Sequence, residues 1–471
     1  MAAILNFFKN FLTLDDVPTN LPETTRNVPV GATIIPRSAH CVSRKQVSDN
    51  ALKVLYRLRK EGFDAYLVGG GVRDLLLGRE PKDFDVVTDA EPEQIARIFS
   101  NCRLIGKRFR LAHICYGRDI VEVATFRKAS DDATQKVRLN KEGRILQDNI
   151  YGTIEEDVWR RDFTINALYY NIWDFTIVDF VGGMADHEAC LIRLIGDASA
   201  RFREDPVRML RAVRFAVKLG FKLHEDCEQA IPLNAHLLAS VPAARLHDEM
   251  AKLFLTGYGV QMFEMLRQHG LFGVLFPAVE KSLSHEEAHF PKMMVINALK
   301  NSDTRIAEGK PVTTYFLLAA LLWEPMLHRA KEKMAKGSHE ADAYNEAASE
   351  VISQQVRRIA VPRHLTLAIR EVWSLQPKFT ARTGMKPNRL MAHPRFRAAY
   401  DFLVLRAQAG SASAELAEWW TAYQNADETE QRKMTQPKQQ QPKKNTKTKA
   451  KRKRNYRRKS TNTVTSSHLE S

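Results

Sequence analysis

The 471-residue chain lacks any long apolar run, and none approaches the roughly 20 residues that a membrane-spanning helix requires. The longest apolar stretch lies around residues 316–323 and is expected to form a buried helix. The N-terminal segment has no basic region and no small-residue cleavage site, so a secretory signal peptide is not expected. These absences favour a soluble protein without a transmembrane segment.

Cysteine is also scarce. The five cysteines form no Cys-x-x-Cys pair, and their odd number does not fit a closed disulfide framework. A zinc ribbon and a disulfide-stabilised secreted domain are therefore both disfavoured. The composition is typical of a cytoplasmic protein whose thiols are reduced and structural.

Most of the chain carries little excess charge. Of the formal net charge of +16, residues 431–471 supply +13, from 14 basic side chains and one glutamate, so residues 1–430 carry only +3. Residues 426–471 are also poor in apolar side chains, which predicts a disordered basic tail. Such a polycation binds phosphate backbones without sequence preference, although general solubility and affinity for anionic membranes are alternative explanations.

The remaining chain divides into three regions by its local patterns. Prolines interrupt residues 1–40, which predicts a weakly structured segment. Residues from about 41 to 185 mix strand and helix signals, whereas the signals from Asp205 onward are almost entirely helical. The expected elements of the mixed region are a helix over 43–61, a strand over 65–68, a short helix over 72–77, a strand centred on Phe84, and strands over 111–116 and 119–126.

A pair of carboxylates stands at the centre of this mixed region. If residues around Phe84 form a strand, Asp83 and Asp85 project from the same face while Phe84 points into the core. Two carboxylates so close together repel each other, and a divalent cation relieves that repulsion. Hard oxygen ligands suit Mg²⁺, which phosphoryl-transfer enzymes often bind in pairs.

A glycine-rich turn precedes the carboxylates. Gly69, Gly70 and Gly71 separate the predicted strand from the predicted short helix, and they allow backbone N–H groups to approach a phosphate. Arg73, in the first turn of that helix, is placed to contact a triphosphate oxygen. The segment matches neither the Walker pattern nor the dinucleotide fingerprint, and a tight strand-to-helix connection is the alternative explanation.

Glu122 offers a third carboxylate. It lies on the predicted strand 119–126, on the same face as Ile120 and Ala124. An acidic side chain within an apolar strand is costly to bury without a partner, and a nearby metal or a role as base would explain it. A glutamate that faces water on an edge strand explains it equally well.

Four motifs in this order resemble those of the class II nucleotidyltransferases, a family that contains bacterial poly(A) polymerases and CCA-adding tRNA nucleotidyltransferases. The resemblance covers roughly residues 45–250, and the motifs are Gly69–Asp74, Asp83-x-Asp85, Arg160–Ala167 and Arg203–Phe215. The resemblance implies an α+β fold, with a polymerase-β-like head followed by all-helical neck and body domains. The corresponding boundaries are 41–185 for the catalytic head, 186–250 for the neck with its base-reading helix, and 251–425 for an RNA-binding body.

The resemblance also implies the site residues. Asp83 and Asp85 would bind the catalytic Mg²⁺ ions, with Glu122 and Asp162 as further catalytic carboxylates. The implied nucleotide contacts are Gly70, Arg73 and Arg161 for the nucleotide, and Asp205, Arg208, Arg211 and Arg214 for its base.

The base-reading pair selects against uracil and guanine but leaves the choice between adenine and cytosine open. A carboxylate accepts from an exocyclic amine while an arginine donates to the adjacent ring nitrogen, and adenine and cytosine both present that pattern. The segments Leu104–Ile114 and Glu122–Arg127 resemble the signature of bacterial poly(A) polymerases, and the basic tail suits an enzyme that acts on many RNAs. We therefore expect template-independent transfer of AMP from ATP to RNA 3′ ends that marks RNAs for decay, with RNA-decay proteins as partners. The alternatives are a CCA-adding enzyme and a non-catalytic RNA-binding protein.

Overall fold

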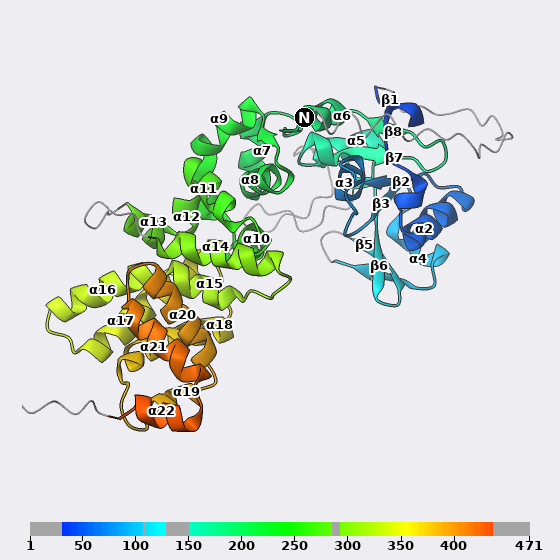
Figure 1. The fold of residues 1–471 in the computed structure, drawn as a ribbon. Helices are drawn as coiled ribbons and strands as arrows, with labels where there is room; N and C mark the ends of the chain where they lie inside the picture. The colour runs from blue at the N-terminus through cyan, green and yellow to red at the C-terminus, as the bar shows by residue number, and fades with distance from the viewer. Residues whose placement is uncertain (1–30, 107–109, 129–149, 285–292, 437–471) are drawn as a thin grey trace, which may run out of the picture.

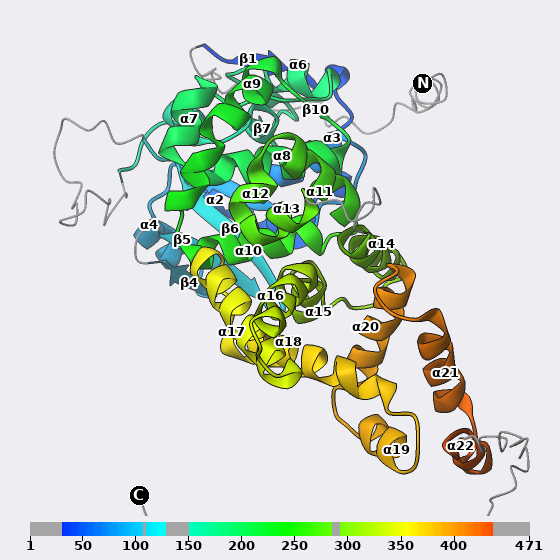
Figure 2. The ribbon, with the colours of Figure 1, turned by 90° about the vertical axis from the view of Figure 1, so that its left-hand side faces the viewer.

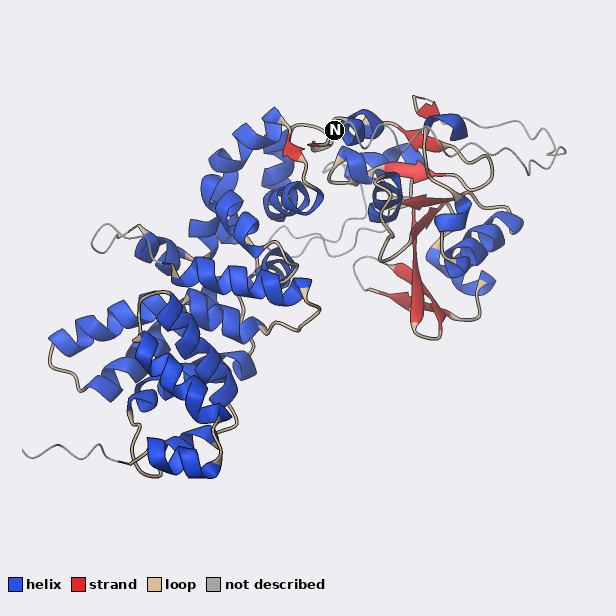
Figure 3. Cartoon of the chain, in the orientation of Figure 1, coloured by secondary structure: helices blue, strands red, loops and turns tan. Residues whose placement is uncertain are grey.

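A computed structural model of the chain describes residues 31–106, 110–128, 150–284 and 293–436. A mixed sheet with short helices forms one part of the molecule, and a long array of helices forms the other (Figures 1 and 3). The basic tail lies mostly beyond Gln436, outside the described residues. None of the helices described is long and apolar enough to cross a membrane.

The mixed sheet has eight strands in the order β1-β8-β7-β2-β3-β6-β5-β4. Its neighbours are antiparallel except β3 and β6, which are parallel. The strands are β1 (Thr33–Ile35), β2 (Ala65–Val68), β3 (Asp85–Thr88), β4 (Cys102–Ile105), β5 (Leu111–Tyr116), β6 (Asp119–Thr125), β7 (Leu168–Tyr170) and β8 (Ile177–Asp179). The predicted strands at 65–68, 111–116 and 119–126 are thus present, whereas the strand predicted around Phe84 begins only at Asp85.

The prediction that residues 1–40 are weakly structured is wrong for their last part. β1 forms an edge strand, in which Thr33 pairs with Asp179 and Ile35 with Ile177 on β8. The β-branched side chains of Thr-Ile-Ile favour an extended backbone, and Pro36 directly follows the strand. Residues 1–30 lie outside the described part of the chain.

Helices cover both faces of the sheet. On one face, α2 (Asp49–Lys60) and α4 (Pro92–Ile98) share a core with β2, β3, β5 and β6. On the other, Val158 of α5 (Ile154–Arg160) packs with Val68 and Val87. The helix predicted over 43–61 begins later, because the Ser48 side chain caps α2 by accepting from the Ala51 N–H, and residues 44–46 form a separate 3-10 turn. Two further short helices, α3 (Gly70–Leu76) and α6 (Gly183–Glu188), complete this part.

The helical part begins with α7 (Ala198–Glu204), α8 (Val207–Leu219), α9 (Glu225–Asn234) and α10 (Ala243–Phe254). A two-stranded sheet of β9 (Leu191–Ile192) and β10 (Lys222–Leu223) lies beside α8. One continuous apolar cluster runs from Phe163 to Leu405 and joins these helices to most of those that follow. Figure 2 shows the helices from another side. The following helices are α11 (Gly259–Gln268), α12 (Leu271–Leu275), α13 (Pro277–Leu283), α14 (Met294–Ala307), α15 (Thr314–Leu321), α16 (Trp323–Ala335), α17 (Glu340–Arg358), α18 (Arg363–Leu375), α19 (Lys386–Met391), α20 (Phe396–Gln408), α21 (Ala414–Asn425) and α22 (Glu428–Met434).

The start of the predicted disordered tail, at residue 426, needs correction. Asp427 caps α22 by accepting from the N–H groups of Thr429 and Glu430, and Met434 packs against the apolar cluster of the last helices. The low apolar content that predicts disorder is outweighed here by this cap and by the contact of the partly buried Met434. Residues 437–471 lie outside the described residues.

Candidate active site

A polar cleft of about 560 Å³ opens between the glycine-rich turn, the start of β3, and helices α8 and α10. Every site residue predicted from the sequence lines it except Glu122. The lining includes Gly70, Arg73, Asp83, Asp85, Arg161, Asp162, Asp205, Arg208, Arg211 and Arg214. The structure therefore brings together residues that lie more than a hundred positions apart along the chain.

The strand predicted to carry both central carboxylates begins at the second of them. Asp83 is exposed in the segment before β3, and Asp85 is the first residue of the strand. Both still line the cleft, and Phe84 between them packs against the core, as the sequence predicts. Glu122 pairs in register with Asp85 on the parallel strand β6. Its side chain is half exposed and lies 3.3 Å from Nε2 of His113. Glu122 thus lies beside the acidic pair without lining the cleft itself.

Burial makes the charge on Asp85 costly. Burial is the main cause that raises the pKa of Asp85 to about 6. The negative charges of Glu122 and Asp83 also raise this pKa, and the positive charge of Arg161 lowers it. These oxygen ligands with excess negative charge fit a hard divalent cation. In the described parts of the chain, no three His, Cys, Asp or Glu side chains are grouped closely enough to hold a metal ion alone.

The glycine-rich turn runs between the acidic pair and Arg161. Gly69 has a φ of +75°, which favours glycine, and a Cβ atom on it would lie 3.6 Å from Oδ2 of Asp85 and 3.8 Å from Nη1 of Arg161. A Cβ atom on Gly71 would lie 3.3 Å from the backbone oxygen of Asp83. Larger side chains would push these groups apart, so the turn sets the width of this end of the cleft.

Arg73 is fixed by partners on three sides. Only 4% of it is exposed, and it donates to Oδ1 of Asp74 and, over 2.7 Å, to Oδ1 of Asn166. Its guanidinium also lies 5.1 Å from the ring centre of Phe215 on α8. Asn166 and Phe215 belong to the motifs found in the sequence, but sequence reasoning assigned neither a role.

Arg161 is fixed in a similar way by residues that sequence reasoning missed. Its Nε donates to the Tyr169 hydroxyl over 2.8 Å, and Nη2 donates to Oδ2 of Asp157 over 2.9 Å. The Tyr169 hydroxyl donates to the same carboxylate, and burial is the main cause that raises the pKa of Tyr169. Asp157 precedes Arg161 by four positions, a spacing typical of helical ion pairs, and this signal was available in the sequence.

Asp162 joins the segment that follows α5 to α8. Its Oδ1 accepts from the Phe163 N–H over 2.8 Å and from the Asn166 amide over 3.3 Å, and its Oδ2 accepts from Arg211 on α8. Burial alone would raise the pKa of Asp162, but the ion pair and hydrogen bonds with Arg211 outweigh burial and lower it. Both carboxylate oxygens therefore have partners within the protein.

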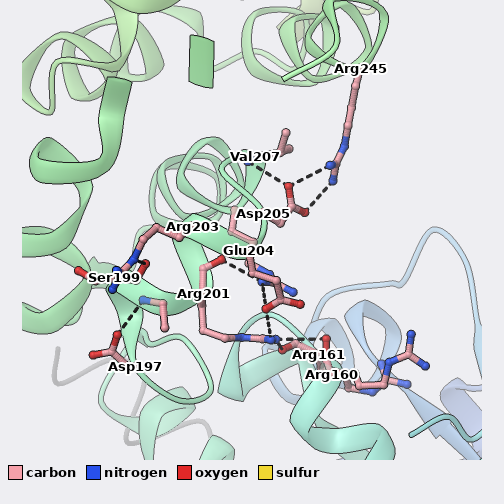
Figure 4. Close-up of polar contacts among 12 residues, drawn as sticks. Arg160, Arg161, Asp197, Ser199, Arg201, Arg203, Glu204, Asp205, Val207 and Arg245 are labelled. Atoms are coloured by element: carbon pink, nitrogen blue, oxygen red, sulfur yellow. Dashed lines mark hydrogen bonds and ion pairs between the residues drawn. The ribbon is translucent and has the colours of Figure 1, made fainter. Parts of the chain in front are cut away.

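The proposed base-reading residues are tied to the helices around them (Figure 4). Arg208 donates through Nη1 to Oε2 of Glu204 and to the backbone oxygen of Arg201. Asp205 accepts from the Val207 N–H over 3.2 Å and from both terminal nitrogens of Arg245. Arg214 lies further along α8, 3.9 Å from Glu249. Arg245 belongs to no motif seen in the sequence.

Three family models match the chain. Residues 65–193 match the family model "Poly A polymerase head domain", residues 220–283 match "Probable RNA and SrmB- binding site of polymerase A", and residues 336–459 match "Polymerase A arginine-rich C-terminus". The chain is 47% identical to poly(A) polymerase I of Salmonella typhi over 409 residues, which cover 85% of this chain and 88% of that protein.

The CCA-adding enzymes are more distant relatives. The chain is 38% identical to the CCA-adding enzyme of Geobacillus thermodenitrificans over 231 residues, which cover 49% of this chain and 55% of that enzyme. The crystal structure of the Bacillus stearothermophilus CCA-adding enzyme in complex with CTP superimposes with a TM-score of 0.51 at 27% identity, covering 79% of this chain and 80% of that one. The 47% identity to poly(A) polymerase I extends through most of the chain. The chain therefore belongs to the poly(A) polymerase family of nucleotidyltransferases.

Proposed function

We propose that the chain transfers AMP from ATP to the 3′ ends of RNA without a template and releases pyrophosphate. The observation that carries this proposal is the cleft in which the acidic pair, the glycine-rich turn and the Asp205/Arg208 pair come together. Its relatives of 46–47% identity over most of the chain are named poly(A) polymerase I. The proposal includes a cytoplasmic role in marking RNAs for decay, with RNA-decay proteins as partners.

In this proposal Asp83 and Asp85 would hold Mg²⁺, a hard cation that suits their carboxylate oxygens. Bound Mg²⁺ would supply positive charge at the attacking 3′ oxygen and at the leaving pyrophosphate. The backbone of the glycine-rich turn approaches the triphosphate at Gly70. Arg73 and Arg161 stay charged within the cleft wall and stabilise the negative charge that develops there, because their partners hold them in place before the nucleotide binds.

The base lies against α8 in this proposal. Asp205 accepts from the exocyclic amine, Arg208 donates to the neighbouring ring nitrogen, and Arg211 and Arg214 line the same wall. Glu122 and Asp162 are proposed as further catalytic carboxylates. Glu122 lies beside Asp85, and Asp162 lines the cleft while paired with Arg211.

A nucleotide-incorporation assay tests the proposal. Purified protein with Mg²⁺ is given either an unstructured RNA or a tRNA that lacks its 3′ end, with each labelled nucleoside triphosphate alone or in mixtures. Long homopolymers from ATP alone are expected. Addition that stops after three nucleotides on the trimmed tRNA and needs CTP would indicate a CCA-adding enzyme, and no incorporation on any RNA would indicate a binding protein.

The basic tail is expected to strengthen RNA binding without affecting nucleotide choice. Deletion of residues 437–471 removes 12 basic side chains and leaves α22 intact. Because released counterions drive this binding, RNA affinity at low salt should fall by roughly tenfold, and the affinity should depend less steeply on salt. Filter binding at several salt concentrations measures the RNA affinity and its salt dependence. In the matched control the tail keeps its length, but its lysines and arginines are replaced by glutamines. A changed preference among the four nucleotides would contradict this role.

A further inference from the structure

Arg245 holds the carboxylate that the proposed function assigns to base recognition. It lies on α10, a helix that packs against α8, and lines the cleft. Its Nη1 donates to Oδ1 of Asp205 over 2.9 Å and its Nη2 donates to Oδ2 over 2.7 Å, so the two planar groups meet as a fork (Figure 4). The Asp205 side chain remains 23% exposed and faces the cleft.

The hydrogen bonds of Asp205 leave little capacity to accept more. An ionised carboxylate has about four lone-pair positions on its two oxygens. Arg245 occupies one position on each oxygen, and the Val207 N–H occupies a second position on Oδ1 over 3.2 Å. One acceptor position therefore remains, and it is on Oδ2.

The number of free acceptor positions on Asp205 distinguishes adenine from guanine. Adenine offers one exocyclic amine beside a ring acceptor, so it needs a single acceptor position. Guanine offers its ring N–H and its amine side by side, and a free carboxylate would accept both as a fork, in the way that it accepts arginine. With Arg245 in place, guanine can make only one of these two bonds and leaves the other donor without a partner, which is costly in a closed site.

We propose that Arg245 is a specificity-determining residue that excludes guanine by occupying the second acceptor position of Asp205. This inference rests on the proposed function, because it takes Asp205 as the base acceptor. Arg245 acts through Asp205 and is a positioning residue in this role. It leaves the choice between adenine and cytosine unchanged, since both bases need the same single acceptor position.

The position of Arg245 is itself fixed by α10. Glu249 lies one turn further along the helix, is 6% exposed and accepts from Lys252 over 2.9 Å, while its other oxygen faces Nε of Arg214 on α8 at 3.9 Å. Leu246 and Met250 of α10 are buried in the main apolar cluster. The helix therefore presents Arg245 to Asp205 from a rigid base.

The test compares nucleotide discrimination in Arg245→Met and Arg245→Lys with that of the unchanged protein. The kcat/KM for a single addition to one RNA primer is measured with ATP, GTP and CTP separately. Arg245→Met is expected to raise GTP use relative to ATP by roughly tenfold, the size of one two-bond contact, while the ATP to CTP ratio stays the same. Arg245→Lys, which keeps the charge but loses the fork, should raise relative GTP use by a smaller factor.

Arg267→Met is the matched control. Arg267 forms the same kind of fork with Glu280, over 3.0 Å and 2.7 Å, at a site that does not line the cleft. It should leave all three nucleotide ratios unchanged. If relative GTP use stays within twofold in Arg245→Met, or in Arg245→Lys where the methionine variant does not fold, the inference is overturned. An equal loss of discrimination against CTP would also overturn it. Failure of the unchanged protein to use ATP would instead reject the proposed function.

Discussion

Asp85→Asn should lose nucleotide incorporation by roughly a thousandfold or more, because it removes a charge that the proposed mechanism uses to hold Mg²⁺. The measurement is single-turnover addition to an RNA primer with ATP and Mg²⁺. RNA retention on a filter should match that of the unchanged protein, because the substitution alters neither the body helices nor the tail. Asp83→Asn should show the same loss of turnover.

The same substitution should stabilise the metal-free protein. The pKa of Asp85 rises from 3.8 to about 6 on folding, first through burial and then through Glu122 and Asp83. A raised carboxylate pKa means that the folded state binds the proton more tightly than the unfolded state. The free energy of unfolding therefore falls as pH rises from about 4 to about 6 and stays lower above that range. Asparagine removes this cost, on the order of 2 kcal/mol at pH 8 after allowance for partial exposure.

Thermal unfolding in EDTA at pH 8 measures that gain. Addition of Mg²⁺ should raise the Tm of the unchanged protein, and should raise it much less in Asp85→Asn. Asp89→Asn is the matched control: Asp89 lies just beyond the other end of β3, burial and Asp64 raise its pKa, and it does not line the cleft. It should keep normal incorporation. Turnover above a tenth of normal in Asp85→Asn would reject the assignment of Asp85.

The sequence predicts the composition of the cleft better than its geometry. The four motifs contain every carboxylate and arginine that lines the cleft except Arg245, and the order of the motifs identifies the fold. Asp83 and Asp85 face one cleft and Phe84 packs against the core, as predicted, but the strand begins at Asp85 and does not include Asp83. Residue periodicity does not locate where a strand begins, nor does it reveal the close approach of the Asp83 backbone oxygen to Gly71.

The residues that sequence reasoning missed act by holding others. Asn166 fixes Arg73 across 93 positions of the chain, and Arg245 reaches Asp205 across 40 positions. Such pairs leave no local pattern, since each partner alone is compatible with an ordinary solvated surface. Only folding, which places α10 against α8 and η3 (Thr164–Asn166) against α3, brings them together. Their roles can be read from tertiary contacts but not from the spacing of residues in a motif.

Asp162→Asn should destabilise the protein by about 3 kcal/mol, because it leaves Arg211 without its buried counter-charge. The cost lies at the lower end of the range for such pairs, since the Arg211 side chain is 34% exposed and keeps some contact with water. The pKa of Asp162 is lowered on folding, so its contribution to stability is present above about pH 4 and is lost as pH falls below its folded pKa. Chemical denaturation at pH 7.5 and at a series of pH values below about 4 measures both effects.

Asp186→Asn is the matched control for this loss. Asp186 is somewhat more buried, with 7% of its side chain exposed against 13% for Asp162, accepts from Arg193 over 2.9 Å and does not line the cleft. It should lower the free energy of unfolding by a similar amount and keep nucleotide incorporation at the temperature where both variants are folded. Asp162→Asn should lose incorporation at that temperature, by roughly a hundredfold, because α8 is no longer tied to the segment that follows α5.

The double variant Asp162→Asn with Arg211→Met separates two roles for Asp162. Removing both charges leaves neither unpaired, so the double variant should be more stable than the sum of the single changes predicts, by about 1.5–3 kcal/mol. If Asp162 acts only by anchoring Arg211, incorporation should recover in part along with stability. If Asp162 is a catalytic carboxylate, as the motif predicts, incorporation should stay lost while stability recovers. If the effects of the two single changes on the free energy of unfolding simply add, Asp162 and Arg211 do not interact. The ion pair would then not hold α8 in place.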